Sequence, residues 1–373
     1  MGAFEEALGK LDLAERCRLI RKNLDRCDER QDYRKETMSG LMSMSSRRLT
    51  INHLDSGGLI TNYYCTSRCR HCLYGCSPEW EKKYIDRETT EKNILKIKSL
   101  ECSSIHIGGG EPILKPDALE MVIETTLSFG VRIEYVETNS SWYKDKESAS
   151  RILSSLRKRG LSTLLISMSP FHNEHIPFYK VKGVIEACRA VGMNVFPWIS
   201  DFYAEIDSFD DKRVHSLSEY ENKYGNDYLE KLPSRYWIHF GGRALKTFGN
   251  VFGRKPYQQV LSSNKGGCLE LLDVSHFHFD LFGNYIPGLC SGLAIHRDDL
   301  GNLINPGKYP FLHILFEKGI TGLFEYASSR YDFRPSDGYM SKCDLCFDIR
   351  RYLVLDRGIV SKDLQPKGFY ENV

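Results

Sequence analysis

Three cysteines stand close together directly after an apolar segment. Cys65, Cys69 and Cys72 have the spacing C-x3-C-x2-C within TNYYCTSRCRHCLYGC, residues 61–76. The preceding residues 58–64 are expected to form a strand, so the cysteines occupy the loop that leaves it. Thiolates this close on one loop can hold three irons of a cubane iron–sulfur cluster and leave the fourth iron without a protein ligand. An open iron of this kind is useful only if another molecule binds it.

Two other interpretations of these cysteines are less favoured. A zinc site normally needs two C-x2-C halves, and the x3 spacing is unusual for it. A disulfide framework is not expected in a long chain for which no secretory signal is recognised. Cys76 extends the row of thiols, and we interpret it as a loop thiol that is not a ligand.

The cysteine spacing resembles the signature of the radical S-adenosylmethionine (radical SAM) superfamily, in which the amino and carboxylate groups of SAM chelate the open iron. A second stretch supports this resemblance: GGGEP, residues 108–112, begins 36 residues after Cys72. It is similar to the GGEP motif that holds the methionine amino group of SAM in that family, and a carboxylate at Glu111 suits an ammonium group. Gly108, Gly109 and Gly110 can adopt backbone angles closed to other residues and leave room for a ligand, although an ordinary strand-to-helix turn would also use them.

Strand-like and helix-like segments alternate after residue 58, which predicts a parallel sheet of α/β class. Six such units suit the partial (β/α)6 TIM-like barrel of the radical SAM family. The expected strands are 58–64, 103–107, 131–136, 162–167, 194–198 and 235–240, and the expected helices are 88–100, 112–129, 144–159, 179–191 and 215–224.

Polar residues fall where the expected strands end, which is where parallel barrels carry their chemistry. Asn139 follows the third strand, and Ser167 and Ser169 follow the fourth. The resemblance implies that Asn139 lies near SAM and that Ser167 lies near its ribose, while Ser169 stands where many relatives have an acidic residue. We therefore predict that these three residues and residues 108–111 bind the cofactor.

The loop after the fourth strand also carries candidate catalytic side chains. His172, Glu174 and His175 follow one another closely, and such groups can exchange protons near neutral pH. The loop leaves a strand at its catalytic end, so we expect substrate contacts or a proton donor there. A solvated surface loop is the alternative.

Four further cysteines stand beyond residue 245, where the strand–helix rhythm stops: Cys268, Cys290, Cys343 and Cys346. This region resembles the SPASM or twitch extensions, in which a hairpin and a later C-x2-C hold an auxiliary cubane. A structural zinc on the same cysteines is one alternative. Another is a metal site of His276, His278 and Asp280, which share one face of a strand by period two, although a packed strand is favoured over ligation for these three.

Three regions are therefore expected: an N-terminal helical extension or cap (1–57), a radical SAM partial barrel (58–245) and a small loop-rich cluster-binding module (246–373). The tail 362–373 is polar, and we expect it to be loosely held. The 373 residues carry a net charge of +2, which disfavours nucleic acid and membrane surfaces as partners. No apolar run suits a signal peptide or a membrane span, so a cytoplasmic location is expected.

The predicted function is that of a radical SAM enzyme. It would cleave SAM reductively and use the 5′-deoxyadenosyl radical to take hydrogen from a small-molecule or peptide substrate. A second 4Fe-4S cluster would assist a net oxidation, cross-link or rearrangement, which leaves open whether the enzyme is an oxidoreductase, lyase or transferase. Flavodoxin or ferredoxin would donate the electron. A peptide maturase of SPASM type is an alternative, although no separate peptide-recognition domain is visible, and a non-catalytic iron–sulfur or zinc protein is a further one.

Overall fold

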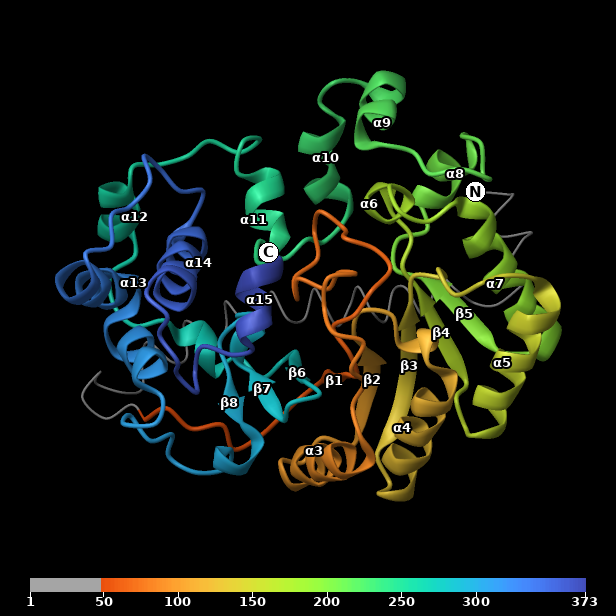
Figure 1. The fold of residues 1–373 in the computed structure, drawn as a ribbon, viewed down its shortest axis with the longest axis horizontal. Helices are drawn as coiled ribbons and strands as arrows, with labels where there is room; N and C mark the ends of the chain where they lie inside the picture. Colours follow the sequence, from red (N-terminus) through yellow and green to blue (C-terminus); the bar gives the residue numbers. More distant parts are fainter. Residues whose placement is uncertain (1–47) are drawn as a thin grey trace.

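One sheet of eight strands organises the protein (Figure 1). The computed structural model describes residues 48–373, and the strand order is β5-β4-β3-β2-β1-β6-β7-β8. The strands are β1 (Gly57–Ile60), β2 (Ser104–Gly108), β3 (Arg132–Thr138), β4 (Thr163–Ile166), β5 (Asn194–Pro197), β6 (Phe277–Phe279), β7 (Asn284–Ile286) and β8 (Ile295–His296). Strands β1 to β6 pair in parallel, whereas β7 and β8 are antiparallel. The predicted α/β class with a parallel sheet is confirmed, and residues 1–47 of the expected N-terminal extension lie outside the described residues.

Helices connect the parallel strands as the sequence pattern predicts. They are α3 (Arg87–Ser99), α4 (Pro116–Ser128), α5 (Lys146–Lys158) and α7 (Phe178–Val191). Two of them begin at an aspartate N-cap, since Asp86 accepts a hydrogen bond from the Thr89 N–H and Asp145 from the Ser148 N–H. The inner faces of these helices bury their aliphatic residues, such as Leu153 of α5. The expected helix 112–129 is divided into η2 (Pro112–Leu114) and α4, which has Pro116 at its first position.

The strand predicted at 235–240 is not formed, so that prediction is wrong. Helix α10 (Tyr228–Arg235) ends there, and the following residues are irregular. Tyr236 and Ile238 are buried while Trp237 is 50% exposed, which explains the strand-like alternation of the sequence. In the described part of the chain no strand pairs with this segment, and the Tyr236 hydroxyl lies 3.2 Å from His71 Nε2. The sixth parallel strand is β6, on the other side of β1.

The region after residue 245 contains more helix than the loop-rich pattern suggests. Its longer helices are α13 (Pro310–Tyr331) and α14 (Lys342–Arg351), and β6 and β7 form an antiparallel hairpin with Gly283 in its turn. The remaining elements of residues 48–373 are α6 (Pro170–Asn173), α8 (Phe202–Asp207), α9 (Leu217–Tyr224), α11 (Arg243–Phe248), α12 (Tyr257–Ser263), η3 (Leu269–Leu272), η4 (Pro287–Leu289), η5 (Arg297–Asp299), the π-helical η6 (Tyr352–Asp356) and α15 (Lys367–Asn372).

The carboxyl-terminal tail is not loosely held, contrary to the prediction from its polar composition. Helix α15 lies against the loop after β1, the orange segment of Figure 1, and buries Phe369 and Tyr370. The Ser77 hydroxyl donates a hydrogen bond of 2.6 Å to Asn372 Oδ1, which joins the tail to that loop. Two aromatic side chains therefore anchor a segment whose other residues are mostly polar. No helix within residues 48–373 has the length and apolar character that crossing a membrane requires.

Candidate functional site

The loop of residues 61–77, here called the cysteine loop, leaves the carboxyl end of β1. Cys65 and Cys69 are buried and Cys72 is partly buried. Short backbone bonds shape the loop, because the Cys72 N–H donates to the Cys69 carbonyl at 3.1 Å and the Cys65 N–H donates to Ser77 at 3.1 Å. Each thiol lies within electrostatic range of the others, so the structure brings the three predicted ligands together.

The three thiols differ in how readily they ionise. Burial raises the pKa of Cys65 to about 12, and burial together with Cys65 and Cys72 raises the pKa of Cys69. A hydrogen bond with the buried Cys76 thiol lowers the pKa of Cys72 to about 5, helped by the nearby Arg243. Buried thiolates need compensating positive charge, which bound metal ions supply.

Arg243, which the sequence interpretation missed, holds the cysteine loop in shape. Its guanidinium is buried and donates to the carbonyls of Cys69 (2.9 Å), Cys76 (2.6 Å) and Asn372 (3.1 Å). The adjacent Gly242 has φ +52°, and a Cβ there would lie 2.5 Å from the Cys72 carbonyl oxygen. The pair of glycines before an arginine was the available signal, because such a turn permits close backbone approach.

The glycine loop after β2 packs on the backbone of the cysteine loop. Gly109 has φ +149°, and a Cβ there would lie 2.6 Å from Asn62 Oδ1. A Cβ on Gly110 would lie 2.0 Å from the Tyr64 carbonyl oxygen, and the Gly110 N–H donates to Asn62 at 2.7 Å. Gly108 instead faces the Glu137 carboxylate, 3.0 Å from where its Cβ would be. The glycines thus allow two loops to meet at the site.

Glu111 is fully buried and joins the glycine loop to the end of β3. Its carboxylate accepts hydrogen bonds from the Ile113 N–H (3.0 Å), the Asn139 N–H (2.7 Å) and the Thr138 hydroxyl (3.0 Å). Burial raises the pKa of Glu111 to about 7 despite these donors. The carboxylate therefore lies at the centre of the site.

Asn139 directly contacts one of the thiols. Its Nδ2 donates to Cys65 Sγ at 3.2 Å, and its Oδ1 accepts from the Ser141 N–H at 2.9 Å. The Ser167 N–H donates to the Thr138 carbonyl at 2.8 Å, which places this serine at the adjoining strand end. Ser169 is buried, and its hydroxyl lies 2.7 Å from His172 Nδ1.

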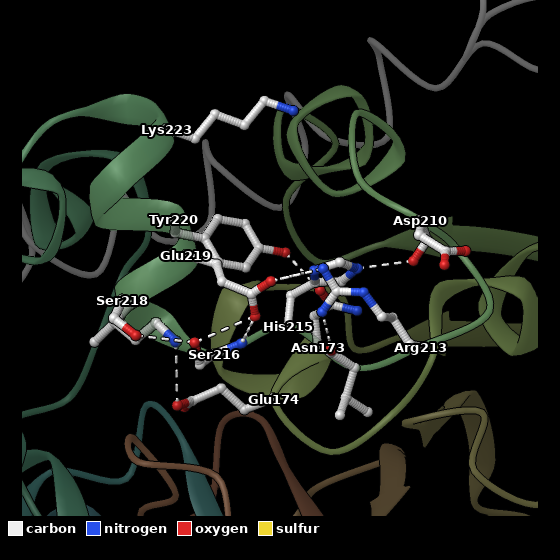
Figure 2. Close-up of polar contacts among 12 residues, drawn as sticks. Asn173, Glu174, Asp210, Arg213, His215, Ser216, Ser218, Glu219, Tyr220 and Lys223 are labelled. Carbon is white, nitrogen blue, oxygen red and sulfur yellow. Dashed lines mark hydrogen bonds and ion pairs between the residues drawn. The ribbon is translucent and has the colours of Figure 1, made fainter.

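The three candidate catalytic residues on the loop after β4 lie in different environments. His172 lies edge-on to His71 of the cysteine loop, with ring centroids 5.0 Å apart, and burial lowers its pKa to about 4. Both carboxylate oxygens of Glu174 accept a hydrogen bond from Arg70 Nε (2.8 and 2.9 Å), and one of them also accepts from the Leu217 N–H. His175 is exposed. Figure 2 shows this loop braced against residues 210–223, where the Tyr220 hydroxyl donates to Asn173 Oδ1 at 2.7 Å.

The four late cysteines line one cavity of about 240 Å³, although they come from distant parts of the chain. Cys268 precedes η3, Cys290 follows η4, and Cys343 and Cys346 lie on α14. Burial and, to a smaller extent, neighbouring thiols raise the pKa of Cys268, Cys290 and Cys343, the last to about 11. We call this group the auxiliary cavity.

Two cations also line the auxiliary cavity. Lys342 pairs with Glu270, whose carboxylate accepts from Cys268 Sγ at 3.2 Å. Arg350 is buried and donates to the Ser291 carbonyl at 2.9 Å, while its Nε has no hydrogen-bond partner within residues 48–373. Positive charge beside several thiols favours their anionic form, which is the form that binds metals.

Comparison with known proteins identifies the first part of this arrangement. Residues 59–216 match the family model described as "Radical SAM superfamily". The chain contains a radical SAM domain. The match includes the cysteine loop, the glycine loop and the loop after β4, and it ends before Arg243 and the auxiliary cavity. No curated protein sequence matches the chain.

Several solved structures resemble the chain at low identity. A crystal structure of BtrN with AdoMet and 2-DOIA shares 14% identity over 73% of this chain and 91% of BtrN, with a TM-score of 0.41. The protein anSMEcpe with bound AdoMet shares 15% identity over 80% of this chain and 96% of its own, with a TM-score of 0.41. SuiB of Streptococcus suis, bound to its precursor peptide SuiA, shares 12% identity over 64% of this chain and 60% of SuiB, with a TM-score of 0.31.

The less favoured alternative of a metal site with His276, His278 and Asp280 does not hold for Asp280. This residue does not join the two histidines, because its carboxylate closes the β6–β7 turn. It accepts from the Phe282 N–H, the Asn284 N–H, the Asn284 side chain and the Tyr63 hydroxyl, at 2.9 to 3.1 Å. The third member of the histidine group is His106 of β2.

Proposed function

We propose that this protein is a radical SAM enzyme that removes hydrogen from a small-molecule or peptide substrate. The observation that carries the proposal is the cysteine loop, in which three thiols meet beside the glycine loop and Asn139 donates to Cys65 Sγ. Cys65, Cys69 and Cys72 would hold a 4Fe-4S cluster through three irons. An electron donor such as flavodoxin or ferredoxin would reduce it.

The residues around the cysteine loop fit a polar cofactor. The buried hydroxyls of Ser67, Ser140 and Ser141 have no hydrogen-bond partner among the described residues, and buried polar groups are normally paired. Ser140 and Ser141 directly follow Asn139. We assign SAM to this edge of the sheet, held by residues 108–111, Asn139, Ser167 and Ser169. When bound, the cluster and SAM supply the 5′-deoxyadenosyl radical by reductive cleavage.

The protein's own residues position the reactants and move protons. Arg243 keeps the cysteine loop closed through the carbonyls of Cys69 and Cys76. Tyr236 and Phe171 enclose His71 beside it. His172 is neutral at pH 7 because burial lowers its pKa to about 4. We propose that His172 contacts the substrate, and that Glu174 and His175 lie at the entrance of the same site.

We also propose that the auxiliary cavity holds a second 4Fe-4S cluster on Cys268, Cys290, Cys343 and Cys346. A zinc ion with four bonds of about 2.3 Å would bring its sulfurs to about 3.8 Å from one another. Within residues 48–373, the group of metal-ligand atoms that lies within 4.8 Å is formed by three histidines and not by these thiols. The thiol spacing, which is wider than around a zinc ion, and the cavity volume of about 240 Å³ favour a cubane. This cluster would bind substrate or accept an electron from it.

Formation of 5′-deoxyadenosine tests the proposed activity. Anaerobically reconstituted protein is incubated with SAM and dithionite, and the product is measured by mass spectrometry. Wild-type protein should form it and Cys65→Ala should not. Cys188→Ala is the matched control, because Cys188 is a buried thiol on α7 outside both cysteine sets. Product from Cys65→Ala, or none from wild type, would contradict the proposal. A mass shift on a short peptide encoded nearby would identify a peptide substrate.

A further inference from the structure

Three imidazoles converge on one face of the sheet, outside both cysteine sets. His106 lies on β2, His278 lies on β6, and His276 directly precedes β6. Strand β1 runs between β2 and β6, and Gly58 is in register with both His106 and His278. A Cβ on Gly58 would lie 2.3 Å from His106 Nε2, so only glycine leaves room for this ring. The absent side chain lets the two flanking strands bring their histidines together.

The distances among the three rings match those of a metal site. The Nε2 atoms of His106 and His278 are 2.9 Å apart, and one ligand atom from each of the three rings lies within 4.8 Å of the others. This separation is that of a hydrogen bond between the rings, and two nitrogens bound to one tetrahedral ion, with bonds of about 2.0–2.1 Å, lie about 3.3 Å apart, so a shift of a few tenths of an ångström would admit the ion. His276 stacks parallel to His106, with ring centroids 5.2 Å apart, and completes the group.

Surrounding side chains orient the rings. The Tyr74 hydroxyl lies 2.7 Å from His278 Nδ1, which leaves Nε2 to face the other rings. Metal-binding histidines usually have their second nitrogen tied in this way. Tyr135 stacks on His106 with centroids 5.2 Å apart, and the Glu137 carboxylate lies 3.9 Å from His106 Nε2. Tyr74 belongs to the cysteine loop, so the histidine group directly adjoins it.

We propose that His106, His276 and His278 bind one divalent transition-metal ion, such as Zn²⁺ or Fe²⁺, separate from the iron–sulfur clusters. Imidazole suits these ions, and three protein ligands leave a coordination position for water or for an oxygen of a bound molecule. The nearby Glu137 carboxylate offsets part of the positive charge. The site rests on the histidine geometry and does not require that the radical chemistry be as proposed.

Zinc retention by the cluster-loaded full chain tests this proposal. The protein is dialysed against Zn²⁺, passed over a desalting column with a weak chelator, and analysed for zinc and iron. Wild-type protein should retain about one zinc per chain with nitrogen and oxygen ligands at about 2.0–2.1 Å in X-ray absorption. His276→Ala and His278→Ala should bind zinc at least tenfold more weakly, with their iron content unchanged.

Two features of the design keep the test decisive. His278 is buried, so its variant could fail to fold, whereas His276 is only partly buried and provides an independent variant. His53→Ala is the matched control, because His53 lies on the surface between the Asp55 and Glu101 carboxylates, where zinc could bind adventitiously. Zinc retained in full by folded His276→Ala, zinc lost with His53→Ala, sulfur ligation, or no zinc in wild type would each overturn the proposal.

Discussion

The cysteine loop and the auxiliary cavity both gather thiols, but they do so in different ways. The cysteine loop brings together residues from one short segment, closed by a backbone bond between Cys72 and Cys69. The auxiliary cavity collects its thiols from three separate elements after residue 267. The first set therefore depends mainly on local geometry and the second on packing of the whole carboxyl-terminal region. Gly242 lines the auxiliary cavity and also packs on the backbone of Cys72. The turn that contains Gly242 therefore lies between the two groups of cysteines.

Iron content gives the largest expected difference between the two sets. Reconstituted wild-type protein should contain about eight irons, since each cubane has four. Replacing Cys65, Cys69 and Cys72 with Ala should leave about four, and so should Cys343→Ala with Cys346→Ala. Only the second variant should still form 5′-deoxyadenosine. If the wild-type protein instead contains four irons and zinc, and the first variant contains no iron but keeps the zinc, the auxiliary cavity holds zinc.

Removing Arg243 should weaken the cysteine loop more than the auxiliary cavity. Arg243→Ala removes one donor from each of three buried carbonyls, of which that of Cys69 keeps the Cys72 N–H, so we expect a loss of about 3 kcal/mol in the free energy of unfolding. Urea unfolding of the full chain, followed by circular dichroism, measures this. Lys246→Ala is the matched control, because Lys246 is exposed on the same helix and should change stability by less than about 0.5 kcal/mol. Equal stability of the two variants would contradict the proposal that Arg243 stabilises the cysteine loop.

Asn139→Ala should affect only the cluster on the cysteine loop. Its Nδ2 donates to Cys65 Sγ, and hydrogen bonds to cluster sulfurs stabilise the reduced, more negative state. The variant should therefore have a more negative reduction potential, by roughly tens of millivolts, at that cluster alone. Redox titration followed by electron paramagnetic resonance separates the two signals. A shift of the auxiliary signal instead would contradict the assignment of the two sites.

The last prediction concerns the metal-free protein, in which the alkylation rates of Cys72 and Cys343 should depend differently on pH. In metal-free protein the pKa of Cys72 is lowered to about 5, so its thiolate population should stay constant above pH 6. The pKa of Cys343 is raised to about 11, so its thiolate population should rise tenfold for each pH unit between 7 and 9. Mass spectrometry of peptides after brief iodoacetamide treatment measures both rates. Parallel pH profiles would show that the two environments do not differ.

Periodicity and turn chemistry were sufficient to predict most of the elements that carry the site. The strands β1 to β5 and the helices α3, α4, α5, α7 and α9 lie close to their expected positions, because each has a regular apolar pattern and clear ends. The segment 235–240 had the right alternation but pairs with no strand among the described residues, since alternation reports burial and not pairing. The tail was misjudged because Phe369 and Tyr370 find a core that its composition does not reveal.

The sequence by itself determined the cysteine loop and the glycine loop, because the spacing of neighbouring residues controls which side chains a short loop brings together. Only the tertiary structure decided the contacts between distant residues. It placed Arg243 on the cysteine loop, gathered the four late cysteines around one cavity, and aligned Gly58 with His106 and His278. Strand register determines the contacts of His106 and His278, because a shift of one residue would turn these side chains to the opposite face of the sheet.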